Sequence, residues 1–142
     1  MIRWQGAQFA ALAVALYESI EGEIMGRIEF SDTDDVNVQK MAYVGVVSGV
    51  GEGMFDPHGT LTREQAAAIL SRLSDALGQP FPAQAPTFAD NDDASPWAVS
   101  SIGRVQAAGV MGGTGGNNFS PSSPYTIEQS IVTLYRLFGM LG

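Results

Sequence analysis

Apolar side chains recur at three- and four-residue intervals in five stretches of the chain, the spacing expected of one face of an α-helix. Four stretches carry at least four such side chains, and the one around Met41 is short. We therefore predict a mainly α protein. The side chains predicted to face its core are Phe9, Leu12, Ala13, Leu16, Tyr17 and Ile20; Val38, Met41 and Ala42; Ala67, Leu70, Leu73 and Leu77; Trp97, Ile102, Val105 and Ala108; and Ile131, Leu134, Tyr135, Phe138 and Leu141.

Residues that satisfy or terminate helix ends predict the helix boundaries. Ser95 is predicted to cap one helix, with Pro96 in its first turn and Gly109 after its end. Asn37 is predicted to cap the short helix, which ends at Gly45. Two further helices begin with capping boxes, in which a threonine and a glutamine three residues later satisfy each other's backbone N–H groups. These pairs are Thr62 with Gln65 and Thr126 with Gln129.

The helices belong to a sequence repeat. The block Gly49–Pro57 recurs as Gly113–Pro121, and an offset of 64 residues relates residues 46–78 to residues 110–142 without a gap. Each block is a glycine-rich loop followed by a capping box. Glycine supplies the positive φ values that a tight loop between helices needs. The phenylalanines predicted to fill the core beneath the loops are Phe55 and Phe119.

A partial unit precedes the two full ones, since residues 5–20 align with residues 62–77 at an offset of 57. Units of helix, loop and helix cannot bury their apolar faces alone, so we expect tandem repeats packed as a pseudo-threefold helical bundle. An upstream segment, another copy of the chain or an adjusted flanking helix would cover the face left by the missing half unit. The predicted segments are 1–24, the C-terminal half of a repeat; 25–80, a repeat with a short first helix; and 81–142, a second full repeat reached through the semi-extended, proline-rich connector 78–86.

Composition narrows the classes of function. The chain has no cysteine, which excludes disulfides and thiolate metal sites. Its net charge of −8 disfavours nucleic acid and anionic lipid, so an anionic ligand would need a local basic site. The most apolar stretch, Phe9–Leu16, is too short to cross a bilayer, which predicts no membrane insertion. With Arg3 before it, the stretch resembles a short signal peptide, but its helical periodicity and the lack of a convincing cleavage site favour a core helix.

The combined motifs resemble the S-layer homology (SLH) domain. Phe88 and Asp90 precede a tryptophan-bearing helix, a Gly-x-Gly-x-x-x-Phe-x-Pro loop follows, and the helix start Thr-Arg-Glu-Gln occurs at residues 62–65. The resemblance covers almost all of residues 30–142 and the half unit before them. In that family, three units form a spindle-like pseudo-trimer that holds proteins on the bacterial cell surface. The resemblance implies a secreted module that binds secondary cell-wall polysaccharide, often with pyruvylated sugars.

The resemblance also implies where a ligand would bind. The arginine of the family's helix start is a main ligand contact, and it matches Arg63; Ile127 and Gly6 occupy the corresponding positions of the other units. In the family, the groove lies between neighbouring units, so glycine-loop backbone and first-helix residues would join the arginine. The implied ligand-binding residues are Arg63, Thr62, Glu64, Gln65, Gly51, Gly53, Asp90 and Trp97.

Arg63 is also unusual by its own chemistry. A cation at a helix N-terminus opposes the helix dipole, at a cost of a few tenths to about 1 kcal/mol. A bound carboxylate would reverse this effect, because spare backbone N–H groups, the positive helix end and the guanidinium would all favour the same anion. The alternative is a solvated arginine paired with Glu64 or Asp56.

Other candidate sites have weaker support. The acidic runs 32–35 and 90–93 lack the carboxylate spacing of a calcium loop, so capping and solvated turns are favoured there, and we expect no metal or cofactor. The glycine loops complete neither a dinucleotide-binding motif nor a P-loop. His58, the single histidine, is interpreted as a surface turn residue. Arg72 and Arg136, at equivalent positions of two helices, are interpreted as structural or surface residues.

These observations predict a non-catalytic module that anchors a larger exported protein at the cell surface by binding wall polysaccharide. The alternative is a structural or oligomerisation module with degenerate sugar sites, because two of three arginine positions are lost. In that case a second copy of the chain would complete the missing half repeat. A hydrolase is disfavoured, since the carboxylates are dispersed and the histidine lies in a turn.

Overall fold

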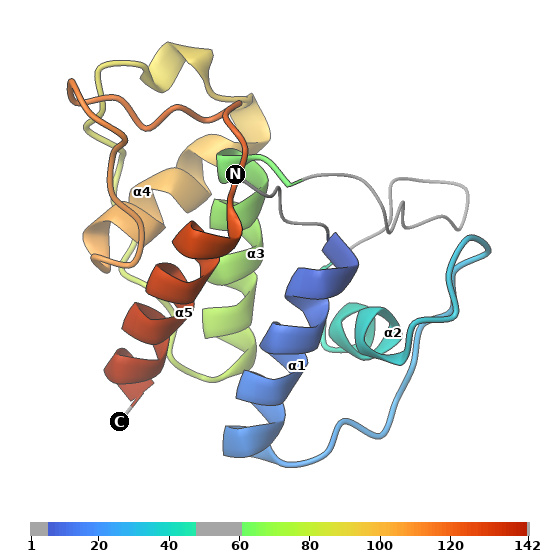
Figure 1. Cartoon of the computed structure of the whole chain (residues 1–142). Helices are drawn as coiled ribbons and strands as arrows, with labels where there is room; N and C mark the ends of the chain where they lie inside the picture. The colour runs from blue at the N-terminus through green and yellow to red at the C-terminus, as the bar shows by residue number, and fades with distance from the viewer. Residues whose placement is uncertain (1–5, 48–60, 142) are drawn as a thin grey trace.

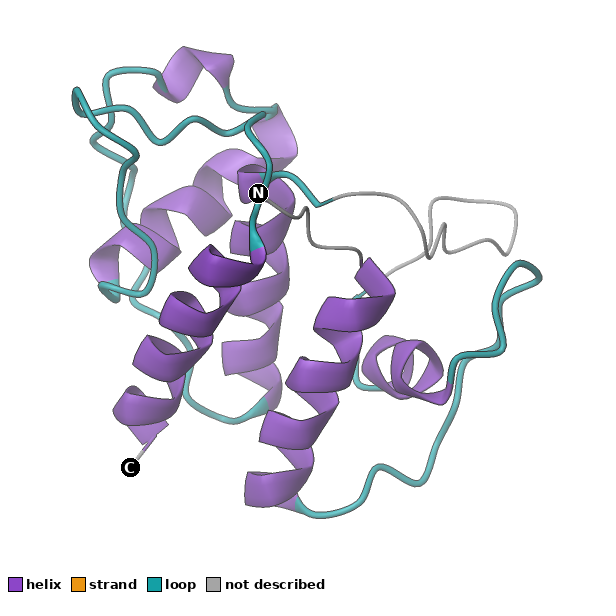
Figure 2. Cartoon of the chain, viewed as in Figure 1, coloured by secondary structure: helices purple, strands orange, loops and turns teal. Residues whose placement is uncertain are grey.

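A computed structural model describes residues 6–47 and 61–141 of the 142-residue chain. Within these ranges the protein is mainly helical, which confirms the predicted fold class, and extended pairing is limited to isolated bridges (Figure 2). No helix in this part of the chain is long and apolar enough to span a membrane. The helices are α1 (Gly6–Glu21), α2 (Val36–Tyr43), α3 (Arg63–Ala76), α4 (Val99–Ala107) and α5 (Ile127–Leu141), with short 3-10 helices η1 (Asn91–Asp93) and η2 (Pro96–Ala98).

The helices pack in successive pairs. Helix α1 lies against α2, and α3 lies against α4 (Figure 1). In each pair, the second helix of one sequence unit contacts the first helix of the next unit. Consecutive units are therefore joined through helix packing as well as through the chain. The pseudo-threefold relation and the segments 1–24, 25–80 and 81–142 stay predictions.

An ion pair at equivalent positions bridges each helix pair. Lys40 Nζ of α2 lies 2.8 Å from Glu18 Oε2 of α1, and Arg104 Nη2 of α4 lies 2.8 Å from Asp75 Oδ1 of α3. Glu18 and Asp75 are related by the 57-residue offset of the partial unit. Both pairs are partly exposed, so they orient the helices more than they stabilise them.

Helix α1 buries Phe9 and Ala13 as predicted, but Leu12 and Ile20 are exposed, contrary to the prediction. Ala10 and Val14, which are smaller side chains, are buried in this helix although they were not predicted to be. Apolar side chains cover more of the surface of α1 than the rest of the protein buries. Periodicity alone therefore also assigned to the core residues at the edge of this apolar face.

The short helix α2 is capped by Asp35 rather than by the predicted Asn37. Asp35 Oδ1 accepts the N–H groups of Asn37 at 2.9 Å and Val38 at 3.1 Å. The prediction of Asn37 was wrong because both residue types cap helices well, and the preceding turn decides between them. In that turn, the Asp35 N–H donates to Thr33 Oγ1 at 3.1 Å. Gly45, with a φ of 83°, follows the helix as predicted.

The first helix of the last unit begins with η2 and continues as α4. Ser95 makes no capping bond, contrary to the prediction. Its N–H lies 3.3 Å from both carboxylate oxygens of Glu64, and its hydroxyl donates to Glu64 Oε1 at 3.1 Å. Ser95 therefore ties the start of this helix to the N-terminal end of α3. Gly109, with a φ of 72°, follows the helix end as predicted.

The predicted apolar face of this helix is only partly correct. Ile102 and Val105 are buried, but Trp97 is 58% exposed. Trp97 belongs to η2, whose 3.0 residues per turn do not continue the α-helical face of Ile102 and Val105. The tryptophan is therefore a surface residue in this fold.

Helix α3 matches its prediction. Thr62 Oγ1 accepts the N–H of Gln65 at 3.3 Å, and Gln65 Oε1 accepts the N–H of Thr62 at 3.0 Å, which completes the capping box. Small side chains on other faces of α3 are buried too, so neighbouring segments cover most of its surface. The predicted core residues Ala67, Leu70, Leu73 and Leu77 are all buried.

Helix α5 buries a face that overlaps its predicted core face only in part, at Leu134, which packs against the core. Ile131, Tyr135 and Phe138 are 60%, 79% and 55% exposed, so their assignment to the core was wrong. The buried face carries Ser130, Thr133 and Leu137 instead. Two of these three residues are polar, which is why apolar periodicity identified a face that is rotated toward solvent from the buried one.

The polar groups of that buried face have partners. The hydroxyls of Tyr125 and Thr133 are hydrogen-bonded to each other, and Thr133 Oγ1 also bonds to the Ser130 carbonyl oxygen at 3.2 Å. Burial raises the pKa of Tyr125, so the phenol stays neutral. The ring of Tyr125 meets Phe9 edge to face, with centroids 5.7 Å apart. This aromatic contact joins α1 to the segment before α5.

The connector 78–86 has no helix or strand, as predicted, but it packs closely on α4. Phe81 is buried, and its carbonyl oxygen accepts Arg104 Nε at 3.4 Å. A Cβ added at Gly103 would lie 1.7 Å from the Gln84 carbonyl oxygen. Gly103 is thus required where the connector crosses the helix, because no side chain fits between the two backbones.

Candidate ligand-binding site

The loop between α4 and α5 forms one wall of the candidate site. At its tip, the Asn118 N–H donates to the Gly115 carbonyl oxygen at 3.0 Å, and the intervening Gly116 and Asn117 have φ values of 60° and 58°. A type I′ turn requires positive φ at both central residues, and glycine and asparagine adopt it with the least strain. Gly115 and Gly116, with φ values of 131° and 60°, therefore serve turn geometry, as the sequence favoured.

Asp90 holds the end of this loop. Its Oδ1 accepts the N–H of Phe119 and its Oδ2 accepts the N–H of Ser120, both at 2.8 Å. Ser120 has a φ of 59°, which is unfavourable for a residue with a Cβ, and the charge-assisted bond to its N–H helps to stabilise that conformation. The Asp90 carboxylate is thus engaged by the backbone of its own unit.

The ionisation of Asp90 reflects opposing effects. Burial tends to raise the pKa of Asp90, while the N–H groups of Phe119 and Ser120 and the positive charge of Arg63 lower it. The net result is a pKa below the ordinary value of 3.8. Asp90 is therefore a carboxylate at neutral pH, and its charge partly balances that of Arg63.

Arg63 is buried, with 5% of its surface exposed. Its Nε donates to the Phe119 carbonyl oxygen at 2.8 Å, and its Nη2 donates to the Gly112 carbonyl oxygen at 2.6 Å. Its Nη1 donates to Gln129 Oε1 at 3.0 Å, and its guanidinium carbon lies 4.7 Å from the centre of the Phe119 ring. Among the described residues, three of the five N–H donors of Arg63 thus have protein acceptors. The alternative of a solvated arginine was therefore wrong, and Asp56, one of its two suggested partners, lies outside the described residues.

The charge of Arg63 survives this burial. Desolvation lowers the pKa of Arg63, and the neighbouring Tyr125 and Asp90 raise it in part. A guanidinium keeps its proton at neutral pH because its intrinsic pKa is far above 7. Arg63 is therefore a buried positive charge held by carbonyl oxygens, an amide oxygen and an aromatic face.

The first residues of α3 pair with the segment before α5. The N–H of Arg63 donates to the Ser123 carbonyl oxygen at 2.9 Å, and the N–H of Glu64 donates to the Pro121 carbonyl oxygen at 3.0 Å. The Tyr125 N–H in turn donates to the Leu61 carbonyl oxygen at 2.9 Å. The expectation of spare N–H groups for an anion was therefore wrong at Arg63 and Glu64, because the neighbouring unit supplies their acceptors.

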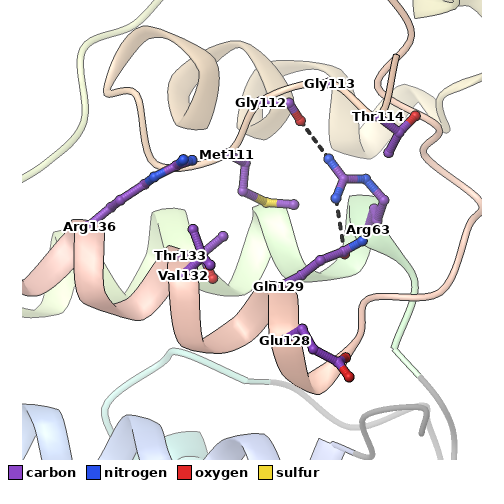
Figure 3. Close-up of a pocket in the computed structure, with 10 residues that line it drawn as sticks. All are labelled: Arg63, Met111, Gly112, Gly113, Thr114, Glu128, Gln129, Val132, Thr133 and Arg136. Atoms are coloured by element: carbon purple, nitrogen blue, oxygen red, sulfur yellow. Dashed lines mark hydrogen bonds between the residues drawn. The ribbon is translucent and has the colours of Figure 1, made fainter. Parts of the chain in front are cut away.

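A pocket of about 490 Å³ lies between this loop and α5 (Figure 3). The side chains that line the pocket are charged, apolar or uncharged and polar. The charged ones are two guanidiniums and one carboxylate. Arg63 lies at one end of the pocket, and Arg136 extends from α5 at the other (Figure 3). The lining residues are Arg63, Met111, Gly112, Gly113, Thr114, Glu128, Gln129, Val132, Thr133 and Arg136.

Of the residues that the sequence implied for ligand binding, Arg63 lines this pocket. Thr62 and Gln65 form the capping box of α3, and Glu64 binds Ser95, so these three residues hold the helix that carries Arg63. Asp90 does not line the pocket, and its carboxylate accepts N–H groups of the loop that does. Trp97 does not line the pocket, and Gly51 and Gly53 lie outside the described residues, as do Phe55 and His58.

Arg136 and Gln129 line the pocket, although neither was predicted to contact a ligand. Gln129 was predicted to complete a capping box with Thr126, and Thr126 Oγ1 does accept the Gln129 N–H at 3.2 Å. The side-chain oxygen of Gln129, however, accepts Arg63 Nη1. Gln129 and Arg136 are seven residues apart, so they share one face of α5. That spacing is the signal that could have identified Arg136 once Gln129 was placed in the site.

No group of three or more histidine or acidic side chains suited to a metal ion occurs within residues 6–47 and 61–141. The two acidic runs have other roles there. Asp35 caps α2, and Asp90 binds loop N–H groups. The capping interpretation is thus correct for Asp35, whereas Asp90 makes no capping bond and binds a loop of its own unit instead.

Known proteins share the motifs of this chain. The profile of the S-layer homology domain matches residues 29–67 and 87–126, together more than half of the chain. An S-layer protein of Bacillus thuringiensis subsp. finitimus and the S-layer protein sap of Bacillus anthracis are each 39% identical to it over 97 residues, which are 66% of this chain and 11% of each relative. An amylopullulanase of Thermoanaerobacterium thermosulfurigenes is 28% identical over 143 residues, or 96% of this chain and 8% of that enzyme. The chain thus spans about a tenth of the length of these relatives.

Replacing Arg63 by alanine should destabilise the fold. The change removes the donor from two carbonyl oxygens and from Gln129, and we expect the free energy of unfolding to fall by about 2–4 kcal/mol. Urea denaturation followed by circular dichroism measures this quantity. Arg72→Ala is the matched control, because Arg72 is an exposed arginine of the same helix and should change stability by less than about 0.5 kcal/mol. Equal stability of the two variants would contradict a structural role for Arg63.

The lowered pKa of Asp90 predicts a pH-dependent contribution to stability. Because the folded pKa lies below 3.8, the contribution is present above that value and is lost as the pH falls through the folded pKa. We expect Asp90→Asn to lower the urea midpoint at neutral pH, and the gap to the wild type to narrow below about pH 3.8. Urea titrations from neutral to strongly acidic pH test this, with the exposed Asp93→Asn as control. A gap that stays constant across the range would exclude the assigned role of Asp90.

Proposed function

The chain belongs to the S-layer homology domain family, and we propose that it binds secondary cell-wall polysaccharide in the pocket between Arg63 and α5, with pyruvylated sugars as the favoured ligands. The family and its S-layer relatives put the chain at the bacterial cell surface as an anchoring module. The finer proposal concerns the ligand that the module binds at the cell wall. By binding that ligand, the module would anchor a larger exported protein to the wall.

The sign of the charge in the pocket is the observation that carries this proposal. The whole chain has 7 basic and 15 acidic residues, yet two of the basic residues and a single acidic one line this pocket. Such a local reversal favours an anionic ligand on a surface that otherwise repels anions. A carboxylate on a neutral sugar chain matches it better than a nucleic acid, whose charge density would meet the surrounding acidic surface.

The size and walls of the pocket support a sugar ligand. A volume of about 490 Å³ is within the usual range for small-molecule sites and accommodates one or two sugar rings. Val132, which is 46% exposed, offers apolar contact to the C–H face of a ring, and Thr114 and Gln129 are hydrogen-bonding neighbours. The same pocket therefore combines charge with the mixed surface that carbohydrates require.

We assign distinct roles to the residues that the family implies. Arg63 contributes positive charge at the pocket wall. Thr62, Glu64 and Gln65 hold the helix that carries it, and Asp90 holds the facing loop. Trp97 stays a candidate for contact with a longer glycan, since its exposed ring lies outside the pocket lining. Gly51 and Gly53 keep their proposed role as loop backbone of an equivalent site.

The module itself is proposed to be non-catalytic. The Asp90 carboxylate is occupied by two backbone N–H groups, which leaves it poorly suited to proton transfer. The amylopullulanase relative is an enzyme by name, but the chain matches only 8% of its length. The activity of such a long protein does not transfer to this segment.

A binding experiment tests the proposed function. We expect the wild-type chain to cosediment with purified cell-wall polysaccharide that carries pyruvylated sugars, and to bind the same polymer at least about tenfold more weakly after chemical removal of the pyruvyl groups. Added salt should weaken the interaction, because part of it is electrostatic. Absence of binding to the pyruvylated polymer would refute the function, and equal binding to both polymers would refute the anionic specificity.

A second candidate function, self-association, is favoured by the outer face of α5. The 64-residue offset matches the exposed Ile131, Tyr135 and Phe138 to residues of α3 that are 0–2% exposed. Those residues are small, and they belong to the helix that packs against α4. The α3 residues are Ala67, Ser71 and Ser74.

The face of α5 is built for a different neighbour from the one that α3 contacts. Large side chains at positions where α3 has alanine and serine would keep a first helix from approaching equally closely. Gly139 replaces Asp75, so the ion pair that orients the α3 and α4 helices has no equivalent acidic partner on α5. A second copy of the chain could present the same apolar face to it, in a symmetric contact that needs no complementary sequence.

Self-association predicts a concentration-dependent mass in sedimentation equilibrium. Tyr135→Glu should shift the protein toward monomer, because it places two like charges in a symmetric contact. Trp97→Glu is the matched control, since it alters another exposed aromatic residue away from α5 and should leave the mass unchanged. A wild-type chain that stays monomeric at all concentrations would rule out this candidate.

A further inference from the structure

The two arginines of the pocket differ in how much of each is available to a ligand. Arg63 is buried and donates through Nε, Nη1 and Nη2 to protein oxygens. A bidentate bond from Arg63 to a carboxylate would have to break at least one of these bonds, because the two parallel N–H groups of a guanidinium edge must point at the anion together. The positive charge of Arg63 acts in the pocket, but three of its five N–H donors already bond to protein oxygens.

Arg136 has the opposite character. Its side chain is exposed, and its Nη1 lies 3.5 Å from the Val110 carbonyl oxygen, at the outer limit of a hydrogen bond. Within residues 6–47 and 61–141, the ion pairs are Lys40 with Glu18 and Arg104 with Asp75, and neither involves Arg136. Arg136 therefore keeps its charge unpaired there and most of its five N–H donors free of protein acceptors.

The position of Arg136 directs these donors at the pocket. It follows Thr133 by three residues and Gln129 by seven on α5, so the three side chains share one helix face, and all three line the pocket. The long bond to Val110 holds the guanidinium beside Met111, at the end of the pocket opposite Arg63 (Figure 3). An anion placed there would meet available guanidinium donors and would also be attracted by the buried charge of Arg63.

We propose that Arg136 is the residue that contacts the anionic group of a pocket ligand directly, while Arg63 holds the pocket wall and supplies background charge. This inference rests on the proposed glycan-binding function and deepens it. The carboxylate of a sugar acid or of a pyruvate ketal is the ligand chemistry that such a fork accepts. Specificity for the acidic group is thereby assigned to α5 of the last unit, outside the Thr-Arg-Glu-Gln helix start.

The test compares four chains for binding to purified pyruvylated cell-wall polysaccharide by isothermal titration calorimetry. Arg136→Ala should weaken binding at least about tenfold, since it removes a charge-assisted hydrogen bond. Arg72→Ala, which removes the arginine at the equivalent position of α3 outside the pocket lining, should bind like the wild type. Glu128→Gln, which removes the carboxylate of the pocket, should bind more tightly, by about twofold or more.

Controls separate this inference from stability and from the function itself. Arg136→Ala should keep the urea midpoint of the wild type, because the side chain is exposed and makes one long bond. It should also bind the polymer about equally before and after chemical depyruvylation, whereas the wild type distinguishes them. If the wild type binds and Arg136→Ala binds within about twofold of it, the role of Arg136 fails and the function stands. If the wild type does not bind, the function and this inference both fail.

Discussion

The guanidinium of Arg63 joins α3 to two later segments of the chain, the loop before α5 and α5 itself. It belongs to the first residue of α3, it donates to two carbonyl oxygens of the loop before α5, and it donates to Gln129 of α5 itself. The backbone N–H groups of Arg63 and Glu64 pair with the same loop. These contacts fix the distance between α3, the loop and α5. The pocket exists because that distance is held, and its shape follows from it.

A buried cation at a helix N-terminus needs compensation, since desolvation and the helix dipole both oppose it. The last unit supplies this compensation through the Phe119 and Gly112 carbonyl oxygens, the Phe119 ring and the nearby Asp90 carboxylate. Asp90 also binds the backbone on either side of the Phe119 carbonyl group, so it orients the oxygen that accepts Arg63 Nε. The motif residues of two units are thus parts of one electrostatic arrangement, and the positive charge of the pocket depends on it.

The repeat is preserved in the helix pairs and broken at α5. Helices α1 and α3 each contact a following first helix, with an ion pair at equivalent positions. Helix α5 carries large apolar residues where α3 carries small buried ones, and a glycine where α3 carries Asp75. One scaffold therefore presents two different surfaces on its last helix. One face lines a charged pocket, and the other exposes an apolar stripe.

The sequence alone determined the helical class, the repeat offsets, the capping box at Thr62 and the family, because periodicity, caps and turn glycines act over a few residues. It could not choose Asp35 over Asn37, nor place Trp97 at the surface, since each choice depends on a neighbouring turn. Only the tertiary structure decided which face of α5 is buried, that Gln129 serves Arg63 rather than its own cap, and that Arg136 enters the pocket while Arg72 does not. The physical reason is that burial and hydrogen-bond partners are set by segments from different units, whose separation no local pattern records.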